Sequence, residues 1–165
     1  MSTKRDTYLK IKEVLEGVPA VKHVRLFNNQ YTNIAREKPF PFPAVFIQFL
    51  ELDYTTRGDL TQDGLTRARL HIGYDSLKTE DLAVFDLLDD IHKALQGLEL
   101  VNVFTPLDRV HEEQDVDHDI ISVWLVDYAF KIRDFSGSRN SKLVAANPQD
   151  VSIAINAGKP WLKQN

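Results

Sequence analysis

The chain has 165 residues, a typical length for one domain that buries its own core. It contains no cysteine, so disulfide bonds and thiolate metal sites are excluded, and any metal would need His and carboxylate ligands. A net charge of -4 argues against a protein whose main task is to grip nucleic-acid phosphates, because that affinity comes from clustered Lys and Arg.

The first part of the chain predicts a helix followed by two strands. Apolar residues recur at helical spacing over residues 3–16, and Gly17 and Pro19 end the pattern. The segment HVRLFN predicts a short strand over residues 23–28. After the proline-rich stretch PFPFP, an aromatic and β-branched run predicts a second strand over residues 44–54.

A long antiparallel hairpin is predicted next. Residues 55–64 form a polar loop, and in residues 65–75 apolar and polar side chains alternate. This strand would pair with residues 44–54, bury one face and present a basic outer face. The expected buried set is Ala68, Leu70, Ile72 and Tyr74, and the expected outer set is Arg67, Arg69, His71 and Gly73.

A second helix follows the hairpin. Thr79 is the expected N-cap, and Gly97 follows the last turn. One apolar stripe is expected to face the core, consisting of Leu82, Phe85, Leu88, Ile91 and Leu95. Two further apolar runs predict strands at residues 100–113 and 119–134.

These elements predict an α+β domain over residues 1–134, with an antiparallel sheet of about four to five strands and two helices packed on one face. Residues 135–165 are rich in small and polar side chains, and we expect them to form a C-terminal arm. The N-terminal residues are charged every few positions, and no long apolar run occurs. We therefore expect a cytoplasmic protein with neither a secretion signal nor a membrane span.

Two of the predicted strands are apolar on both faces. In AVFIQFLEL, Val45 and Ile47 oppose Phe46, and in IISVWLV, Val123 opposes Trp124. Because helices can cover only one face of such a sheet, part of the other face must contact the C-terminal arm or another subunit. The pattern predicts a homo-oligomer.

The stretch HEEQDVDHD, residues 111–119, holds five carboxylates and two imidazoles. It can be the charged turn between the last two strands, a charge cluster at a subunit interface, or the metal site of a small enzyme that uses His111, Asp115 and His118. In an extended chain the ligand types divide between two faces, which favours the charged turn. The chain also lacks nucleophile and phosphate-binding motifs, so we expect no catalytic residue, metal or cofactor.

The candidate interface residues come from these patterns. Arg57-Gly58-Asp59 matches an adhesion tripeptide, but a Gly-Asp pair in a hairpin loop is already explained by the turn. The long loop that holds the tripeptide is suited to ordering on a neighbouring copy, and the arginines of the basic face can pair with the acidic stretch of that copy. The full set is Phe46, Arg57, Asp59, Arg67, Arg69, His71, Glu112, Glu113, Asp115, Asp117, Trp124 and Trp161.

The order of these segments resembles the tail terminator, or tail completion, proteins of long-tailed bacteriophages and prophages. The segments are PAVFIQF, GLTRARLHIGYD, DLAVFDLLDDIHKALQGL, EEQDVDHD and ISVWLVDYAFKIRD. The resemblance covers residues 3–134. It is most specific at Pro43-Ala44-Val45, which enters a strand, and at Trp124 and Asp127-Tyr128 in the last strand.

The resemblance implies a structural virion protein that forms a ring, typically a hexamer, on the head-proximal end of a completed tail tube. The ring would stop tube polymerisation and offer a surface to the connector of the head. The implied partners are copies of itself, the tail tube protein and head-tail connector or neck proteins, with no specific nucleic-acid or membrane partner. A head-closure or connector adaptor is the alternative structural interpretation, and the metal-dependent enzyme is the alternative from another class.

Overall fold

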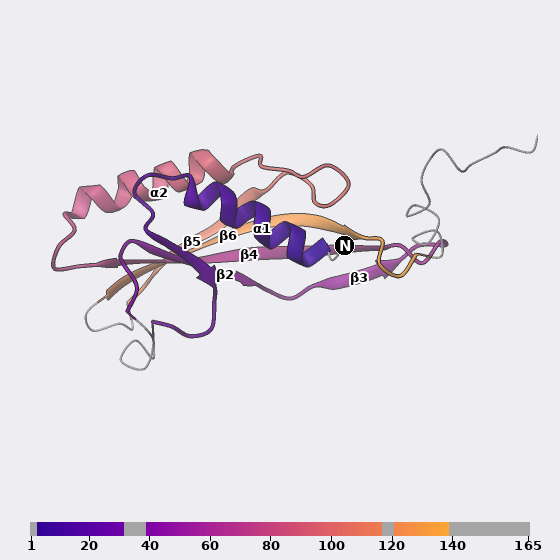
Figure 1. The fold of residues 1–165 in the computed structure, drawn as a ribbon, viewed down its shortest axis with the longest axis horizontal. Coiled ribbons are helices and arrows are strands. Elements are labelled where there is room, and N and C mark those ends of the chain that lie inside the picture. The colour runs from indigo at the N-terminus through magenta and orange to yellow at the C-terminus, as the bar shows by residue number, and fades with distance from the viewer. Residues whose placement is uncertain (1–2, 32–38, 117–120, 139–165) are drawn as a thin grey trace, which may run out of the picture.

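The structure is a computed structural model that describes residues 3–31, 39–116 and 121–138 (Figure 1). These residues form two helices and six strands, which confirms the predicted α+β class. In chain order the elements are α1 (Thr3–Glu16), β1 (His23–Leu26), β2 (Ala44–Phe49), β3 (Asp53–Thr56), β4 (Gln62–Asp75), α2 (Asp81–Leu95), β5 (Asp108–Asp115) and β6 (Ile121–Asp134).

The described strands form one mixed sheet in the order β1-β2-β4-β6-β5, and β3 pairs with β4 beyond the end of β2. β4 and β6 are antiparallel and pair over their full length, from Gln62 with Asp134 to Asp75 with Ile121. β1 and β2 instead run parallel, so the predicted wholly antiparallel sheet is wrong at this edge. The reason is the long connection at residues 27–43, which returns the chain to the starting end of β1.

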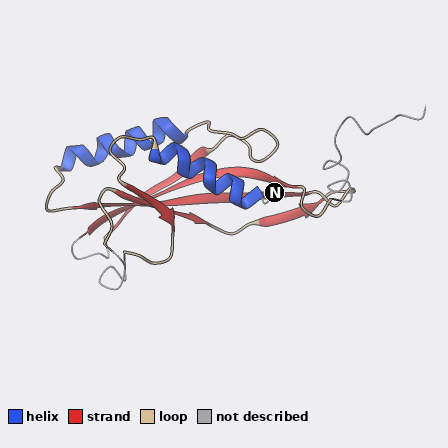
Figure 2. Ribbon diagram, viewed as in Figure 1, coloured by secondary structure: helices blue, strands red, loops and turns tan. Residues whose placement is uncertain are grey.

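Both helices pack on the same face of the sheet, which we call the helix face (Figure 2). Ile11 and Leu15 of α1 and Leu88 and Ile91 of α2 are buried there in one cluster with sheet residues such as Leu70. The predicted placement of two helices on one face is confirmed. Burial of these side chains is the main source of stability for the two layers.

The opposite face, which we call the outer face, carries a second apolar cluster. Phe46 and Val123 are buried there, and the ring of Tyr31 meets Phe46 edge to face with 4.9 Å between centroids. We call the side chains that pack over this face the aromatic cover; they are Phe27, Tyr31, Phe40 and Phe42. The connection between β1 and β2 therefore covers the second apolar set. These are the apolar residues for which the sequence predicted a contact with the C-terminal arm or another subunit; here the aromatic cover packs on them, and the homo-oligomer stays a prediction.

The run predicted as one strand over residues 44–54 forms two strands. Phe49 of β2 pairs with Ala68 of β4, and Asp53 of β3 pairs with Leu65. Between these two pairs the chain advances four residues from β2 to β3 but only three along β4. One extra residue on the β2–β3 side therefore interrupts the pairing, as in a β-bulge. The predicted loop at 55–64 shrinks to the turn between β3 and β4.

The buried stripe of α2 is rotated from its predicted position. Leu82 and Phe85 are 76% and 54% exposed, so their assignment to the core is wrong, whereas Val84 and Leu87 are buried. The other predicted members are confirmed as core residues, namely Leu88, Ile91 and Leu95. The helix contains Val84 and Leu87 in addition to the five residues of the predicted stripe, so two overlapping apolar stripes are possible and the periodicity alone does not choose between them.

The two predicted ends of α2 have different outcomes. Glu80, not Thr79, occupies the N-cap position, and its side chain makes no capping hydrogen bond. The predicted Thr79 cap is therefore wrong, because the backbone NH of Thr79 closes the preceding turn on the carbonyl oxygen of Asp75 (3.0 Å). Gly97 follows the helix with a φ of 77°, as the sequence predicted.

Residues 111–115 of the acidic stretch lie in β5, an exposed strand that pairs along β6. Their interpretation as a turn is wrong, and residues 117–119 lie outside the described residues. The predicted strand at residues 100–113 also starts later, at Asp108. Dense charge and the register shift between Arg109 and His111 are typical of an exposed edge strand, so charge density alone did not indicate a turn.

Candidate functional site

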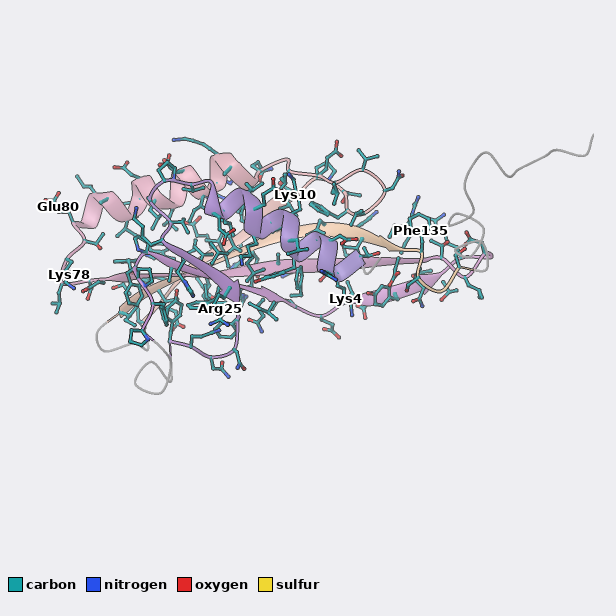
Figure 3. All side chains as sticks on the ribbon, in the orientation of Figure 1. Lys4, Lys10, Arg25, Lys78, Glu80 and Phe135 are labelled. Carbon is teal, nitrogen blue, oxygen red and sulfur yellow. The ribbon has the colours of Figure 1, made fainter. Side chains whose placement is uncertain are left out.

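The sheet continues past the helices into a projection that we call the distal arm. It consists of β3, the turn at residues 57–61 and the paired ends of β4 and β6, and it extends beyond the N-terminal end of α1 (Figure 1). Figure 3 labels two residues of this region: Lys4 lies in the first turn of α1, near the start of the projection, and Phe135 directly follows β6.

The turn at the tip of the distal arm is fixed by local hydrogen bonds. The backbone NH of Arg57 donates to the carbonyl oxygen of Thr61 (2.8 Å). The carboxylate of Asp59 accepts from the NH and the hydroxyl of Thr61 (3.0 and 2.7 Å), and these hydrogen bonds lower the pKa of Asp59. Two predicted interface residues, Arg57 and Asp59, therefore meet in one ordered turn.

Leu60 occupies an unusual backbone conformation at this tip. Its φ is 66°, in the left-handed region that residues with a side chain rarely adopt, and its side chain is 42% exposed. The conformation costs about 1 kcal/mol or more relative to an ordinary backbone. The turn therefore holds an apolar side chain toward solvent at a conformational cost, which is typical of a contact surface.

Asp63 joins the strands of the arm. Its carboxylate accepts from Nε of Arg133 on β6 (2.8 Å) and forms an ion pair with Arg57. The hydrogen bond from Arg133 is the main cause of the lowered pKa of Asp63. All three side chains are exposed or half-buried, so the network orders the arm more than it stabilises the whole fold.

A groove of about 920 Å³ runs along the outer face of the distal arm. Its walls are β3 and the loop at residues 99–106, and its floor is formed by the ends of β4 and β6. The NH of Thr105 donates to the carbonyl oxygen of Lys131 (2.9 Å), which holds this loop beside β6. The groove is therefore a fixed feature of the described structure.

The lining of the groove combines balanced charge with exposed apolar groups. Its charged residues are Asp53, Arg57, Asp63, Glu99, Lys131 and Arg133, of which the two arginines already pair with Asp63. Leu65 and Val101 also line it and are largely exposed. This mixture suits a protein segment with apolar and polar side chains better than a phosphate or another small anion.

Arg69 is paired within its own chain. Its Nε and Nη2 donate to the two carboxylate oxygens of Asp127 (2.7 and 2.9 Å), and Asp127 is buried. The pKa of Arg69 is raised, mainly by this hydrogen bond and further by the charges of Asp127 and Glu113. The expectation that Arg69 pairs with an acidic stretch across a subunit boundary is therefore wrong, whereas Arg67 is exposed on the outer face.

His71 and Phe46 are not surface residues. His71 is buried, stacks on Phe27 with 3.6 Å between ring centroids, and shares a hydrogen bond with Oε1 of Gln48 (2.8 Å). Phe46 is 1% exposed beneath the aromatic cover. Both positions were predicted as interface residues on an open face, and both are wrong because the aromatic cover occupies that face.

The remaining predicted residues are spread over the molecule. Trp124 is half-buried on the helix face, where Phe85 contacts it edge to face at 6.1 Å. Glu113 and Asp115 lie on the outer face of β5, and Glu112 lies on the helix face, as the register with β6 requires. Asp117 and Trp161 lie outside the described residues.

Sequence reasoning missed two carboxylates that organise the outer face, Asp127 and Asp63. Asp127 is the only charged residue in the run ISVWLVDYAF, and a single charge in a buried strand requires a partner, so this signal was available. No comparable signal marked Asp63, whose two arginine partners come from the β3–β4 turn and from β6, 70 residues further along the chain.

The described residues contain no group of three or more His, Asp or Glu side chains placed to hold a metal ion. His111 and Asp115 of the metal interpretation lie on β5, and His118 lies outside the described residues. In the described ranges, neither helix combines the length and the apolar character needed to cross a membrane. No protein-family model matches this chain, and the comparison with curated proteins gave no match.

Proposed function

We propose that this protein caps the head-proximal end of a phage tail tube as a ring, ends tail polymerisation there and prepares the tail to join a head. The observation that carries the proposal is the order of elements. In chain order, the five segments that resemble tail terminator proteins contain β2, most of β4, α2, the last residues of β5 and β6. The protein would assemble in the host cytoplasm and remain in the neck of the virion.

The distal arm supports a role in assembly. Its tip holds Leu60 in an exposed, conformationally costly position, and its groove has the mixed lining of a protein contact. In the proposed ring, such arms contact the last tube subunits, so that the ring buries the open end of the tube. The opposite side of the ring then presents a surface to which no further tube subunit adds.

The charge of the chain is consistent with a ring through which DNA passes. With a net charge of -4, the protein lacks the excess of Lys and Arg that would retain a phosphate backbone inside a channel. The genome would therefore pass the neck without being held there.

Electron microscopy of tails assembled with and without the protein tests the proposal. A terminator predicts tubes of uncontrolled length in its absence and tubes of uniform length when it is restored. Tails of normal length that fail to join heads would instead favour the connector or neck adaptor. Tails of normal length that join heads without the protein would contradict both structural functions.

A paired substitution at the tip sharpens this test. Leu60→Asp should leave the fold intact, since the side chain is exposed, but should abolish capping and give overlong tubes. Gly58→Ala is the matched control two residues away, because an added Cβ there meets no atom within 4 Å. Equal tube lengths for the two variants would show that the tip makes no contact with the tube.

A further inference from the structure

The two edges of the sheet carry charge of opposite sign. α2 and β5 together contain eight Asp or Glu residues and two Lys or Arg residues, and we call this side the acidic edge. Residues 3–26, which hold α1 and β1, contain six Lys or Arg residues and three Asp or Glu residues, and we call this side the basic edge. β1 and β5 stand at opposite ends of the strand order in the described residues.

The two cations of the acidic edge already form ion pairs with carboxylates of the same edge. Lys93 pairs with Asp90 (3.3 Å), and Arg109 pairs with Glu112 (2.9 Å). Exposed carboxylates remain at other positions, including Asp86 and Asp89, and the partner of Glu113 is the imidazole of His111 (3.5 Å), not a lysine or arginine. Exposed apolar side chains lie among them, namely Leu82, Phe85 and Val116. The edge thus combines an uncompensated negative charge with an apolar patch, the two ingredients of a protein interface.

The basic edge has the complementary arrangement. A hollow of about 380 Å³ between α1 and β1 is lined by Lys12, Lys22 and Arg25. Its one carboxylate, Glu16, pairs with Lys12 (3.5 Å). Figure 3 shows Arg25 on the β1 side of the molecule. The exposed apolar residues of this side are Leu9 and Leu26.

The electrostatics of His23 agree with a positive potential in this hollow. The pKa of His23 is lowered, first by burial and then by the charges of Arg25 and Lys12, which outweigh the opposing effect of Glu16. A carboxylate entering the hollow would meet cations that lack a full set of neutralising partners.

We propose that the acidic edge of one copy binds the basic edge of a second copy, so that the chain associates head to tail. The inference rests on the proposed function for the ring, and it names the surfaces that would form it. β1 runs antiparallel to β5 within the sheet, so a neighbouring copy in the same orientation would bring β5 and β1 together as antiparallel strands. A head-to-tail contact of this kind closes into a ring when its rotation permits.

The charge pattern also argues against pairing of like edges. Two acidic edges would place carboxylates opposite one another, and two basic edges would do the same with cations. Like charges across an interface disfavour association by several kcal/mol. A two-fold dimer through either edge is therefore disfavoured by the same charges that favour the head-to-tail contact.

Charge reversal tests the proposal in solution. The acidic-edge variant is Asp86→Lys with Glu113→Lys, and the basic-edge variant is Lys22→Glu with Arg25→Glu. Sedimentation at low salt should show association of the unmodified chain, and each variant alone should associate on the order of 100-fold more weakly. An equal mixture of the two variants should associate again, because the unaltered acidic edge of one variant can bind the unaltered basic edge of the other, and the two reversed edges also have opposite charge.

The control reverses the same number of charges away from both edges. Arg67→Glu with Lys131→Glu changes two exposed cations on the central strands β4 and β6 and should associate like the unmodified chain. Circular dichroism identifies any variant that fails to fold. The proposal is overturned if the unmodified chain stays monomeric at low salt, if the control weakens association equally, or if the mixture does not associate.

Engineered cysteines give a second test that needs no charge change. The natural chain has no cysteine, so every cross-link reports on the introduced residues. Leu26→Cys and Gln114→Cys place thiols on the helix-face side of the two edge strands. A chain with both should give a ladder of multimers on oxidation, and each single variant should stay monomeric. Dimers from a single variant would show a like-edge contact instead.

The two proposals fail in distinguishable ways. If the edges associate as described but the protein leaves tube length unchanged, the ring surfaces stand and the tail function is wrong. If tubes are capped normally by the acidic-edge and basic-edge variants, the tail function stands and the assigned edges are wrong.

Discussion

Gly73 lies on β4 directly beneath the ring of Tyr31, whose hydroxyl is within hydrogen-bonding distance of the carbonyl oxygens of Ala44 and His71 (2.6 and 3.2 Å). The absence of a side chain at this position lets the phenol ring reach the sheet and close the aromatic cover. The close contact, and not a special backbone angle, requires glycine here.

Gly73→Ala should lower the free energy of unfolding by about 1–3 kcal/mol, because the added Cβ overlaps the Tyr31 ring and the cover must move. Urea unfolding followed by circular dichroism measures the change. Gly58→Ala is the control, since its added Cβ has open space, and it should stay close to the unmodified chain. Equal midpoints for the two variants would mean that Tyr31 does not seal this face.

Because Arg69 pairs with the buried Asp127, substitutions at Arg69 and at the nearby Arg67 should have unequal effects on stability. Arg69→Met leaves the 1% exposed carboxylate of Asp127 without its partner and should cost about 3 kcal/mol. Arg67→Met, two residues away on the same face, should change stability by less than about 0.5 kcal/mol because Arg67 is exposed.

Urea unfolding measures both variants of this pair. Arg69→Met combined with Asp127→Leu should recover much of the loss, because no buried charge then remains. No recovery in the double variant would show that the arginine acts through packing.

At the scale of elements, α2 predicts that neighbouring leucines differ in their contribution to stability. Leu88→Ala should lower the free energy of unfolding by about 2–5 kcal/mol, because Leu88 is buried against the sheet. Leu82→Ala should change it by less than about 0.5 kcal/mol, since Leu82 is 76% exposed. Thermal or urea unfolding separates them. A larger loss of unfolding free energy for Leu82→Ala than for Leu88→Ala would mean that Leu82 faces the core, as the sequence predicted.

The elements themselves were largely predictable because their periodicity is local. α1, α2, β4 and β6 all occur where the apolar spacing predicted them. The register of β4 with β6 and the parallel β1–β2 pair depend on long connections, and no local pattern specifies them.

The candidate site was less predictable, for a physical reason. His71 alternates with apolar residues like a surface side chain, and only the return of Phe27 over the sheet buries it. Arg69 likewise gave no indication that Asp127, 58 residues later, would be its partner. A pattern in one strand predicts which face a residue points to, but not what covers that face.

At the scale of the whole molecule, two tyrosines predict how stability depends on alkaline pH. Burial raises the pKa of Tyr31 under the aromatic cover and of Tyr128 on the helix face above the ordinary value of 10.0. Their contribution to stability is complete below pH 10 and is lost as pH rises above it, because only the unfolded chain then ionises them.

The slope of this loss is the measurable quantity. Each tyrosine should lower the free energy of unfolding by up to about 1.4 kcal/mol per pH unit above its ordinary pKa. Urea unfolding at several alkaline pH values should therefore show a shallower slope for Tyr31→Phe than for the unmodified chain. Parallel slopes would mean that Tyr31 ionises as readily in the folded protein as in the unfolded one.

The position of β6 constrains how the chain reaches its fold. β6 is the last described strand in the chain, yet it lies between β4 and β5, and the hydroxyl of Thr3 donates to the carbonyl oxygen of Arg133 (3.1 Å). While the chain is being synthesised, β4 and β5 each lack their central neighbour until almost all of these residues have emerged. Folding should then finish in one late step governed by contacts distant in sequence, and chains truncated before β6 should aggregate through the open side of β4.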